Sequence, residues 1–279
     1  MKELRSSIDQ SINLVEEHLV GFVETRYVRR TQRYFIGYLS SQTGCNRGCR
    51  MCHLTASKQM QFINCTMDDF VDQMSLILEK YDNDTSADYM HINWMARGEP
   101  LSNPTITDRG TEVLSRLGEM ARVRGLPAKF NISTIMPRSM RCDLVQMFPY
   151  ITPTIYYSIY SVVDDFRKRW LPGAMDVNSA LEMLARYQSH SKKIIKFHCA
   201  FIKGENDDEK DINLMMSTIS RFGIVGEFNI VRYNPFSPEQ GSESDLIHQI
   251  SDMIGQYMPC KIIPRVGTDV HASCGTFVG

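Results

Sequence analysis

The sequence lacks several features that would assign the chain to a simple class. No apolar stretch in its 279 residues approaches the length of a membrane-spanning helix, and the start, MKELRSSIDQ, contains no hydrophobic signal core. We therefore expect no membrane contact, no secretion signal and a cytoplasmic location. Neither sign of charge dominates, because 31 basic residues face 32 acidic ones and the net charge is −1. This balance argues against binding nucleic acid through bulk charge, although it leaves room for a local basic face.

Disorder and repetition are also missing. Hydrophobic residues make up 43% of the chain, which is ordinary for a folded globular protein, and no segment is repeated or of low complexity. Against these absences stand eight cysteines, in a chain of this size without an export signal. A disulfide framework is not expected in that setting, so metal binding or redox chemistry is the favoured explanation.

From Tyr34 onward, apolar runs of strand length alternate with segments of helical period. The runs are YFIGYLS, DYMHINWMA, AKFNIST, TIYYSIY, IIKFHCAFI and GEFNIVRY. Strands that alternate with helices predict βαβ units and a parallel sheet. Because no glycine-rich phosphate loop follows the first strand, we expect an α/β fold of the partial (β/α)6 TIM-like barrel type rather than a dinucleotide-binding sheet. In such barrels the chemistry gathers at the carboxyl ends of the strands.

The pattern predicts two parts of the chain. Residues 1–33 would form a short extension, with a helix from Ile8 to Leu19 and a β-hairpin stretch from Val20 to Arg33, and residues 34–279 would form the core barrel and its tail. Within the barrel, Thr66 is placed to cap a helix with one apolar face. Further helices are expected over 111–122, 139–147, 212–219 and 246–254.

The loop after the first barrel strand holds Cys45, Cys49 and Cys52 in the segment CNRGCRMC. Three thiolates within eight residues form a chelating arrangement, and soft sulfur ligands select zinc or iron–sulfur clusters. A structural zinc site requires four ligands, and His53 is awkward as the fourth because it directly follows Cys52. Three ligands suit a catalytic cluster in which one iron stays open. Both interpretations, cluster and zinc, remain open at this stage.

The second predicted strand ends in MARGEPL, residues 95–101. A glycine lets a ligand approach the backbone closely, and the adjacent carboxylate of Glu99 can hold an ammonium group. The cysteine triad after the first strand and GEP after the second, in a βα series, resemble the radical S-adenosylmethionine (SAM) superfamily. The resemblance implies a [4Fe–4S] cluster on Cys45, Cys49 and Cys52 that binds the amino and carboxylate groups of SAM.

More of the sequence resembles the RlmN/Cfr family of RNA methyltransferases within that superfamily. The matching segments occur in order over about the last nine-tenths of the chain: LSSQTGCNRGCRMC, GEPLSN, Ser133-Thr134, Ser158-Ile-Tyr160 with Asp164 and Arg167, Tyr233-Asn-Pro-Phe236 and GTDVHASCG. The resemblance implies SAM contacts from Gly98, Glu99, Ser133, Ser158, Tyr160 and Asn234. It also makes Glu24, in FVETRY, the family's catalytic glutamate, against the plainer interpretation of a surface strand residue. Two positions depart from the family, which usually has histidine at Tyr160 and an apolar residue at Arg97.

Cys274 matches the methyl-carrying cysteine of the family, in the pattern DxxAxCG at residues 269–275. In that family one SAM methylates this cysteine, and a 5′-deoxyadenosyl radical from a second SAM then removes hydrogen from the S-methyl group. The resulting methylene radical adds to an sp² carbon of adenine, C2 or C8, in RNA. This chemistry requires a thiolate that can be alkylated, a nearby cluster and a dry barrel.

One functional position is missing. The family resolves its covalent RNA adduct with a second cysteine, seven residues before the first cluster cysteine, where this chain has Tyr38. A phenol with a pKa of about 10 is a poor base near neutrality and cannot form the disulfide that releases product. Another thiol moves in, release follows a different route, or the reaction differs. The unassigned cysteines are Cys65, Cys142, Cys199 and Cys260, whose plain interpretation is as small buried hydrophobic residues.

The start of the chain departs from the family as well. The family carries an additional N-terminal RNA-binding domain of helices, and this chain begins almost at Glu24, so we expect that domain to be lacking. A basic cluster remains, interleaved with aromatic residues. It comprises Arg26, Arg29, Arg30 and Arg33 with Tyr27, Tyr34 and Phe35, and is either a small nucleic-acid face or the solvated side of a hairpin.

The leading hypothesis is a cytoplasmic, monomeric radical SAM methyltransferase of the RlmN/Cfr type. It would methylate adenine in rRNA or tRNA, with Cys274 as the methyl carrier, Glu24 assisting proton transfer, and a reducing partner such as flavodoxin or ferredoxin. The first alternative keeps the radical chemistry but acts on DNA, a nucleotide or a small molecule, as Tyr38 and the short N-terminus suggest. The second is a non-catalytic, metal-stabilised binding module.

Overall fold

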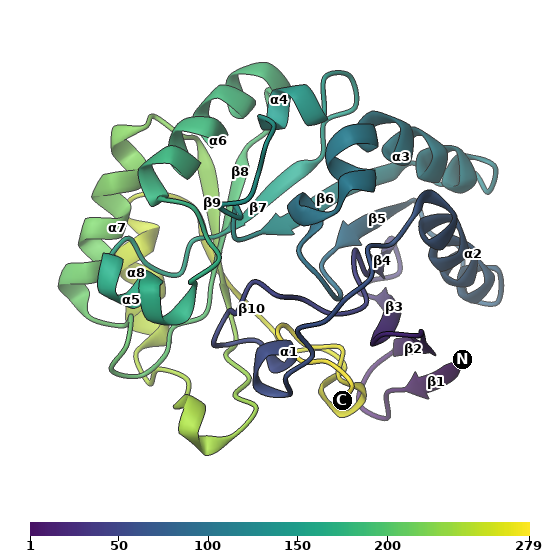
Figure 1. Ribbon diagram of the computed structural model, residues 1–279, viewed down its shortest axis with the longest axis horizontal. Helices are drawn as coiled ribbons and strands as arrows, with labels where there is room; N and C mark the ends of the chain where they lie inside the picture. The colour runs from purple at the N-terminus through teal and green to yellow at the C-terminus, as the bar shows by residue number, and fades with distance from the viewer.

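The computed structural model describes all 279 residues and places ten strands in one sheet, in the order of the sequence (Figure 1). The strands are β1 (Lys2–Arg5), β2 (Ser11–Glu17), β3 (Phe22–Arg29), β4 (Tyr34–Leu39), β5 (Tyr89–Trp94), β6 (Ala128–Thr134), β7 (Thr154–Ser158), β8 (Ile195–Cys199), β9 (Gly226–Val231) and β10 (Cys260–Ile263). Pairing is antiparallel from β1 to β4 and parallel from β4 to β10. The two edge strands, β1 and β10, do not pair, so the barrel is partial.

Helices cover the outer face of the curved sheet, except α1 (His53–Ala56), which lies beside the C-terminal tail (Figure 1). They are α1 (His53–Ala56), α2 (Met67–Asp82), α3 (Pro104–Arg122), α4 (Leu144–Met147), α5 (Asp164–Trp170), α6 (Val177–Ser191), α7 (Glu209–Arg221) and α8 (Ile247–Gly255). Three single turns of 3₁₀-helix lie at Pro100–Ser102, Pro238–Gln240 and Thr268–Val270. The predicted α/β fold, a partial TIM-like barrel, is confirmed, and β10 adds a seventh parallel strand to the six expected. No helix combines the length and the apolar character needed to cross a membrane.

The α2 helix illustrates how the sequence builds these units. Thr66 caps it, accepting a hydrogen bond from the Asp69 amide while the Asp69 carboxylate accepts from the Thr66 amide. The buried face of α2 packs on β4, where Gly37 makes room for Ile77. A Cβ atom at Gly37 would lie 2.7 Å from Ile77 Cδ1, so the helix sits closer to the strand than a larger residue would allow.

Alternation along the strands separates an apolar outer layer from a polar lumen. On β4, Phe35 and Leu39 are fully buried, whereas Tyr34 and Tyr38 line the space inside the barrel. The same pattern recurs on β5, β6, β8 and β9, whose lumen positions carry His, Asn, Lys and Glu. Parallel barrels normally fill this space with branched aliphatic side chains. The polar lumen therefore holds a cavity where a packed core would be expected.

The predicted helix from Ile8 to Leu19 is wrong, because Ser11–Glu17 forms strand β2. The Asp9 carboxylate accepts a hydrogen bond from the Ser11 amide, which closes a turn just before the strand. Residues 11–15 are then buried without interruption, as in a strand covered on both faces, and the β-branched Ile12 and Val15 suit that conformation. The β stretch expected from Val20 to Arg33 contains one strand, β3, which pairs antiparallel with β2 and with β4.

Two other helices differ in extent from the prediction. The segment expected over 139–147 is helical only over Leu144–Met147, where Asp143 forms the cap, and the helix expected from residue 111 begins at Pro104 behind an Asn103 cap. Since β3 pairs with β4, the N-terminal strands and the barrel share one sheet. The division of the chain at residue 33 stays a prediction.

Candidate functional site

The three motif cysteines lie in the loop between β4 and α1. Cys45, Cys49 and Cys52 line a cavity of about 160 Å³ at the carboxyl ends of the strands. Backbone hydrogen bonds fix the loop, from Cys45 to the Gln59 carbonyl at 3.1 Å and from Cys52 to the Cys49 carbonyl at 3.1 Å. None of the eight cysteines forms a disulfide, so all three thiols are available as ligands.

The local environment keeps these thiols protonated in the absence of a metal. Burial raises the pKa of Cys45 to about 12, and it also raises the pKa of Cys49 and Cys52. Each of Cys45 and Cys49 is further disfavoured as a thiolate by neighbouring cysteines. Positive metal charge would reverse this preference, since a coordinated thiol is deprotonated. The donor set therefore fits a cluster that supplies the compensating charge.

Geometry separates the cluster from the zinc interpretation. The structure contains no group of three or more His, Cys, Asp or Glu side chains placed to hold a metal ion. The cysteine ligands of an iron–sulfur cluster each bind a different iron, so they need not converge on one point. His53 is also engaged, because its Nε2 lies 3.0 Å from the Asn234 carbonyl oxygen. The three thiols around a shared cavity therefore favour a cluster over a four-ligand zinc site.

Glu99 presents a carboxylate to the same cavity. The amides of Leu101 and Ile135 each donate to it at 3.1 Å, yet burial dominates and raises its pKa to about 7. An approaching ammonium group would stabilise the charged form of such a carboxylate. Gly98 is required beside it, because its φ is +92° and a Cβ there would lie 2.5 Å from Ser41 Oγ.

The other predicted SAM-contacting residues divide between two cavities. Ser133 on β6 and Ser158 on β7 line the cysteine cavity, with their hydroxyl oxygens 3.5 Å apart, and Tyr160 lines it from a left-handed turn at φ 54°. Burial raises the pKa of Tyr160 well above its usual value, so the phenol is neutral. Asn234 lies elsewhere. It lines a second, larger cavity and donates from Nδ2 to the Cys274 carbonyl at 3.0 Å.

Cys274 lies between the two cavities. The second cavity, of about 510 Å³, occupies the polar lumen, and only Met95, His198 and Cys274 line both spaces. The Cys274 side chain is exposed to the two cavities that it borders, and the walls of those cavities surround it with protein. Burial, followed by the charge of Cys52, raises the pKa of its thiol to about 11. A single sulfur thus faces the motif cysteines on one side and the lumen on the other.

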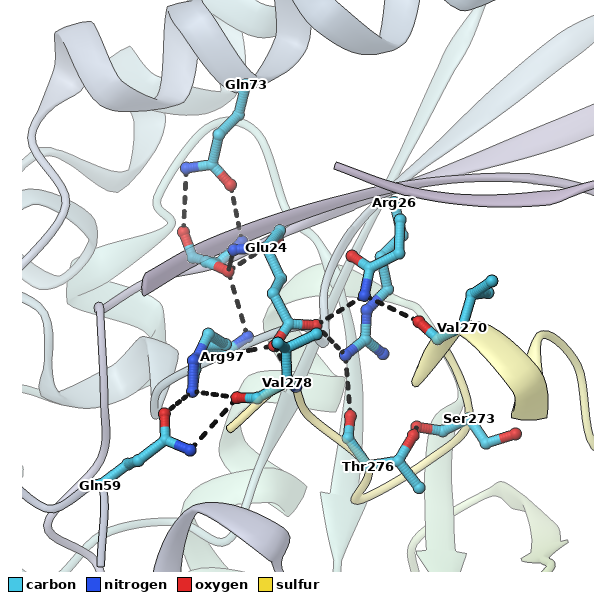
Figure 2. Close-up of polar contacts among 11 residues, drawn as sticks. Glu24, Arg26, Gln59, Gln73, Arg97, Val270, Ser273, Thr276 and Val278 are labelled. Carbon is cyan, nitrogen blue, oxygen red and sulfur yellow. Dashed lines mark hydrogen bonds and ion pairs between the residues drawn. The ribbon is translucent and has the colours of Figure 1, made fainter. Parts of the chain in front are cut away.

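Glu24 lies in neither cavity, and its carboxylate is fully buried among protein partners (Figure 2). Its Oε2 atom accepts from Asn13 Nδ2 and from the Arg26 guanidinium, both at 2.9 Å, and its Oε1 atom accepts from the Val278 amide at 2.9 Å. The interpretation as a surface strand residue is therefore wrong. The geometry gives Glu24 a positioning role toward the C-terminal tail, and direct proton transfer stays a prediction.

Arg97 completes this buried network (Figure 2). Its guanidinium lies 3.7 Å from Glu24 Oε1 and donates to the Val278 carbonyl at 3.1 Å and to the Gln59 side chain. Arg26 also donates to the Thr276 carbonyl at 2.9 Å. The departure from the family at Arg97 thus has a structural partner in Glu24. Sequence analysis did not link the two residues, because the contact joins β3 to the loop after β5.

Tyr38 lines the lumen together with Cys274. Burial raises the pKa of its phenol, and the neighbouring Arg30 opposes this without reversing it. The four unassigned cysteines line neither cavity. Cys65 and Cys199 are buried, and Cys142 and Cys260 pack partly buried against the core. None of them stands beside Cys274 in the structure as a substitute for the missing cysteine.

The four arginines of the basic cluster near the N-terminus divide into two pairs with different surroundings. Arg33 pairs with Asp88 at the surface, as expected for the solvated side of a hairpin, whereas Arg29 faces Asp84 with a buried side chain. Arg26 and Arg30 instead line the lumen. Sequence analysis missed the lumen itself, although polar residues at every second strand position, as in Lys196 and His198, were an available signal.

Comparisons with known proteins show which sequences and folds this chain is similar to. No protein-family model matches the chain. It is 28% identical over 262 residues to the dual-specificity RNA methyltransferase RlmN of Aliarcobacter butzleri, covering 90% of this chain and 68% of the relative. It is 25% identical over 242 residues to RlmN of Wolinella succinogenes, covering 85% and 65%. The chain therefore spans about two thirds of the length of these relatives.

Solved structures show the same fold. A radical SAM methyltransferase from Sphaerobacter thermophilus matches 99% of this chain and 80% of its own, with a TM-score of 0.79 at 20% identity. SuiB of Streptococcus suis bound to S-adenosylmethionine matches 82% of this chain and 47% of its own, with a TM-score of 0.55 at 13% identity. The chain is therefore a divergent homologue of the proteins named RlmN, with the fold of a radical SAM methyltransferase.

Proposed function

We propose that this protein is a radical SAM methyltransferase that methylates adenine in RNA and uses Cys274 as the methyl carrier. One observation carries the proposal: Cys274 is the only thiol that lines both the cysteine cavity and the lumen. A methyl carrier must face its donor and its acceptor in turn, and this position allows both without moving the backbone. The homology to RlmN proteins supports RNA as the substrate class.

Each residue of the small cavity has a part in this proposal. Cys45, Cys49 and Cys52 would hold a [4Fe–4S] cluster, which with SAM supplies the 5′-deoxyadenosyl radical chemistry. Glu99 would hold the ammonium group of SAM, for which its raised pKa leaves it poised near neutrality. The sugar and carboxylate of SAM would meet the hydroxyls and backbone at Gly98, Ser133, Ser158 and Tyr160, which line the same space or flank it.

Cys274, held in place by its neighbours, would carry out the methyl transfer. The Cys274 thiol must lose a proton before it can attack a methyl group, since the thiolate is the nucleophile. Its raised pKa makes this a demanding step, which a cationic methyl donor at the cluster side would ease. Asn234 holds the Cys274 carbonyl, and Glu24 with Arg97 anchors the residues that follow it.

The test is anaerobic reconstitution with iron and sulfide, addition of SAM and a one-electron reductant, and mass spectrometry of the tryptic peptides. We expect a methyl group on Cys274, SAM cleavage, and methylated adenine in RNA added as substrate. Cys142→Ala is the matched control, because Cys142 lines neither cavity, and it should behave as the wild type. An unmodified Cys274 in a reconstituted protein that cleaves SAM would refute its role as carrier.

Product release is a separate part of the proposal, since Tyr38 replaces the cysteine that the family uses. The Tyr38 phenol shares the lumen with Cys274 but is harder to deprotonate than a thiol, whose ordinary pKa is about 8.5. Tyr38→Cys should therefore raise multiple turnover at least about tenfold while leaving Cys274 methylation unchanged. Equal turnover in both proteins would show that release here uses no second thiol.

An external one-electron reductant such as flavodoxin or ferredoxin belongs to the same proposal, as do a cytoplasmic location and a monomeric state.

A further inference from the structure

The lumen cavity has a length and position suited to a ligand of nucleotide size. Its volume of about 510 Å³ falls within the range of roughly 300–1,000 Å³ typical of small-molecule sites. Glu227 and Lys261 line it at the amino ends of β9 and β10, and Val231 lines it at the carboxyl end of β9. The four residue steps from Glu227 to Val231 span about 13 Å. Cys274 borders the far end, so a ligand in the lumen would reach it.

The walls of this cavity carry a surplus of positive charge. Six cations line it against one carboxylate, Glu227; the cations are Arg26, Arg30, Lys196, Arg232, Lys261 and Arg265. Lys196 and Lys261 share Glu227, whereas Arg232 and Arg265 pair with Glu243 and Arg26 pairs with Glu24, two carboxylates that do not line the cavity. Arg30 pairs with no carboxylate. The chain as a whole has a net charge of −1, so this surplus is local. A partly buried cationic wall is complemented by an anion.

The histidines of the lumen do not contribute to this charge. Burial lowers the pKa of His91 to about 4, with further lowering from Lys129 and Lys196, and burial also lowers the pKa of His198 to about 4. Both are neutral at pH 7 and can serve as hydrogen-bonding or stacking groups. The lysines and arginines therefore hold the whole of the surplus.

Between the cationic end and Cys274, the lumen offers groups that recognise an aromatic base. Asn229 on β9 is only 6% exposed, lines the cavity, and makes no side-chain hydrogen bond within the protein. Asn131 donates to Asn93 at 2.6 Å, which leaves the Asn131 carbonyl oxygen free. Aromatic rings at Tyr34 and Tyr156 line the same space. Amides whose donors and acceptors face a cavity can form hydrogen bonds with the edge of a base.

We propose that the lumen binds a phosphorylated nucleoside, with the phosphate at the Lys196–Glu227–Lys261 group and Arg30, and the base beside Asn229 on the side of Cys274. The proposal deepens the proposed function, on which the role of this ligand as methyl acceptor rests. The same chemistry is available from a free nucleotide and from a nucleotide within an RNA strand. The protein groups that would bind the phosphate form a site that is independent of the cluster and of SAM.

Binding of AMP and adenosine to the reconstituted protein, measured by calorimetry without turnover, tests the phosphate site. We expect AMP to bind at least about tenfold more tightly than adenosine, a factor worth about 1.4 kcal/mol. Lys261→Ala should weaken AMP binding several-fold and leave adenosine unchanged. Its side chain is 64% exposed, so the substitution does not threaten folding. Equal affinities for AMP and adenosine would overturn the proposal.

Two further variants distinguish a site from a general charge effect. Glu227→Gln removes the carboxylate that offsets two lysines, so AMP should bind more tightly, the opposite of Lys261→Ala. Lys129→Ala is the matched control, because Lys129 packs on the Tyr89 ring at 3.9 Å and does not line the cavity. The same response from all three variants would refute the assigned phosphate site.

A short adenine-containing oligoribonucleotide identifies the source of the ligand. Tighter binding of the oligonucleotide than of AMP would assign the site to a nucleotide within RNA, and weaker binding would assign it to a free nucleotide. Cys274 methylation and SAM cleavage are measured in the same preparations. If they persist while AMP selectivity is absent, only this inference fails, whereas AMP selectivity without Cys274 methylation would count against the proposed function alone.

Discussion

At the scale of single residues, Glu24 shows how one carboxylate can stabilise the C-terminal tail. It compensates two buried guanidinium groups, Arg26 and Arg97, and also accepts from the Val278 amide. Glu24→Gln keeps the shape but leaves the two arginines without their counter-charge, so we expect a loss of about 3–5 kcal/mol in the free energy of unfolding. Urea denaturation measures it. The control Glu112→Gln breaks an exposed pair with Arg109 and should change stability by less than about 0.5 kcal/mol.

A second readout separates positioning by Glu24 from proton transfer. If Glu24 anchors the tail, Glu24→Gln should also speed the alkylation of Cys274 by iodoacetamide several-fold, and Glu24→Gln/Arg97→Leu should recover part of the lost stability. Unchanged stability and alkylation, combined with blocked product formation, would instead establish Glu24 as a proton-transfer group and refute the anchoring role.

Glu99 makes folding depend on pH. Burial raises its pKa from 4.5 to about 7, so between these values the folded chain holds a proton that the unfolded chain releases. The stability that Glu99 contributes to the fold is therefore fully present below a pH of about 4.5 and is lost as the pH rises through about 7. Glu99→Gln should flatten this slope when urea denaturation is compared at pH 5 and pH 8. Parallel pH dependences of wild type and variant would contradict the assigned shift.

At the scale of elements, the tail that carries Cys274 is held by contacts to distant segments. The Gly267 amide donates to Asp9 at 2.8 Å and the His53 amide donates to the Gly275 carbonyl at 3.0 Å, so the N-terminal strands and the cysteine loop both hold it. Gly267 permits the entry turn. Its φ is +53°, and a Cβ there would lie 2.7 Å from Ala272 Cβ and 2.9 Å from Ser11 Cβ.

Gly267→Val should therefore loosen the tail without unfolding the barrel. Hydrogen exchange followed by mass spectrometry should show faster exchange over 267–278 and unchanged exchange in β5 to β9. Gly223→Val is the matched control, because Gly223 has a φ of +63° and nothing within 4 Å of its Cβ position, so it introduces backbone strain without a clash. Faster exchange throughout the barrel would show that the tail does not move as an independent unit.

At the scale of the whole molecule, the sequence predicted what is encoded locally and missed what depends on distant contacts. The cysteine loop, the GEP turn and the Thr66 cap are contiguous motifs, and the structure forms a turn or cap at each. The surroundings of Glu24 were not predictable, since its partner Val278 lies 254 residues away. The helix predicted from Ile8 to Leu19 is wrong for a related reason. Pairing with β3 makes this segment a strand, although the spacing of its apolar residues suits a helix.

A cluster on the three motif cysteines would join these parts. Since the pKa values of Cys45, Cys49 and Cys52 are all raised, assembly must displace a proton from each thiol, and reconstitution should be more complete at pH 8 than at pH 6.5. Cys49→Ser should lose the iron and the visible absorption of a [4Fe–4S] cluster, whereas Cys142→Ser should keep both. Reconstitution should also slow hydrogen exchange in the tail, because the cysteine loop holds Gly275. A colourless protein that binds one zinc ion with equal affinity in the wild type and Cys142→Ser, and that never takes up iron, would refute the cluster and the radical chemistry built on it.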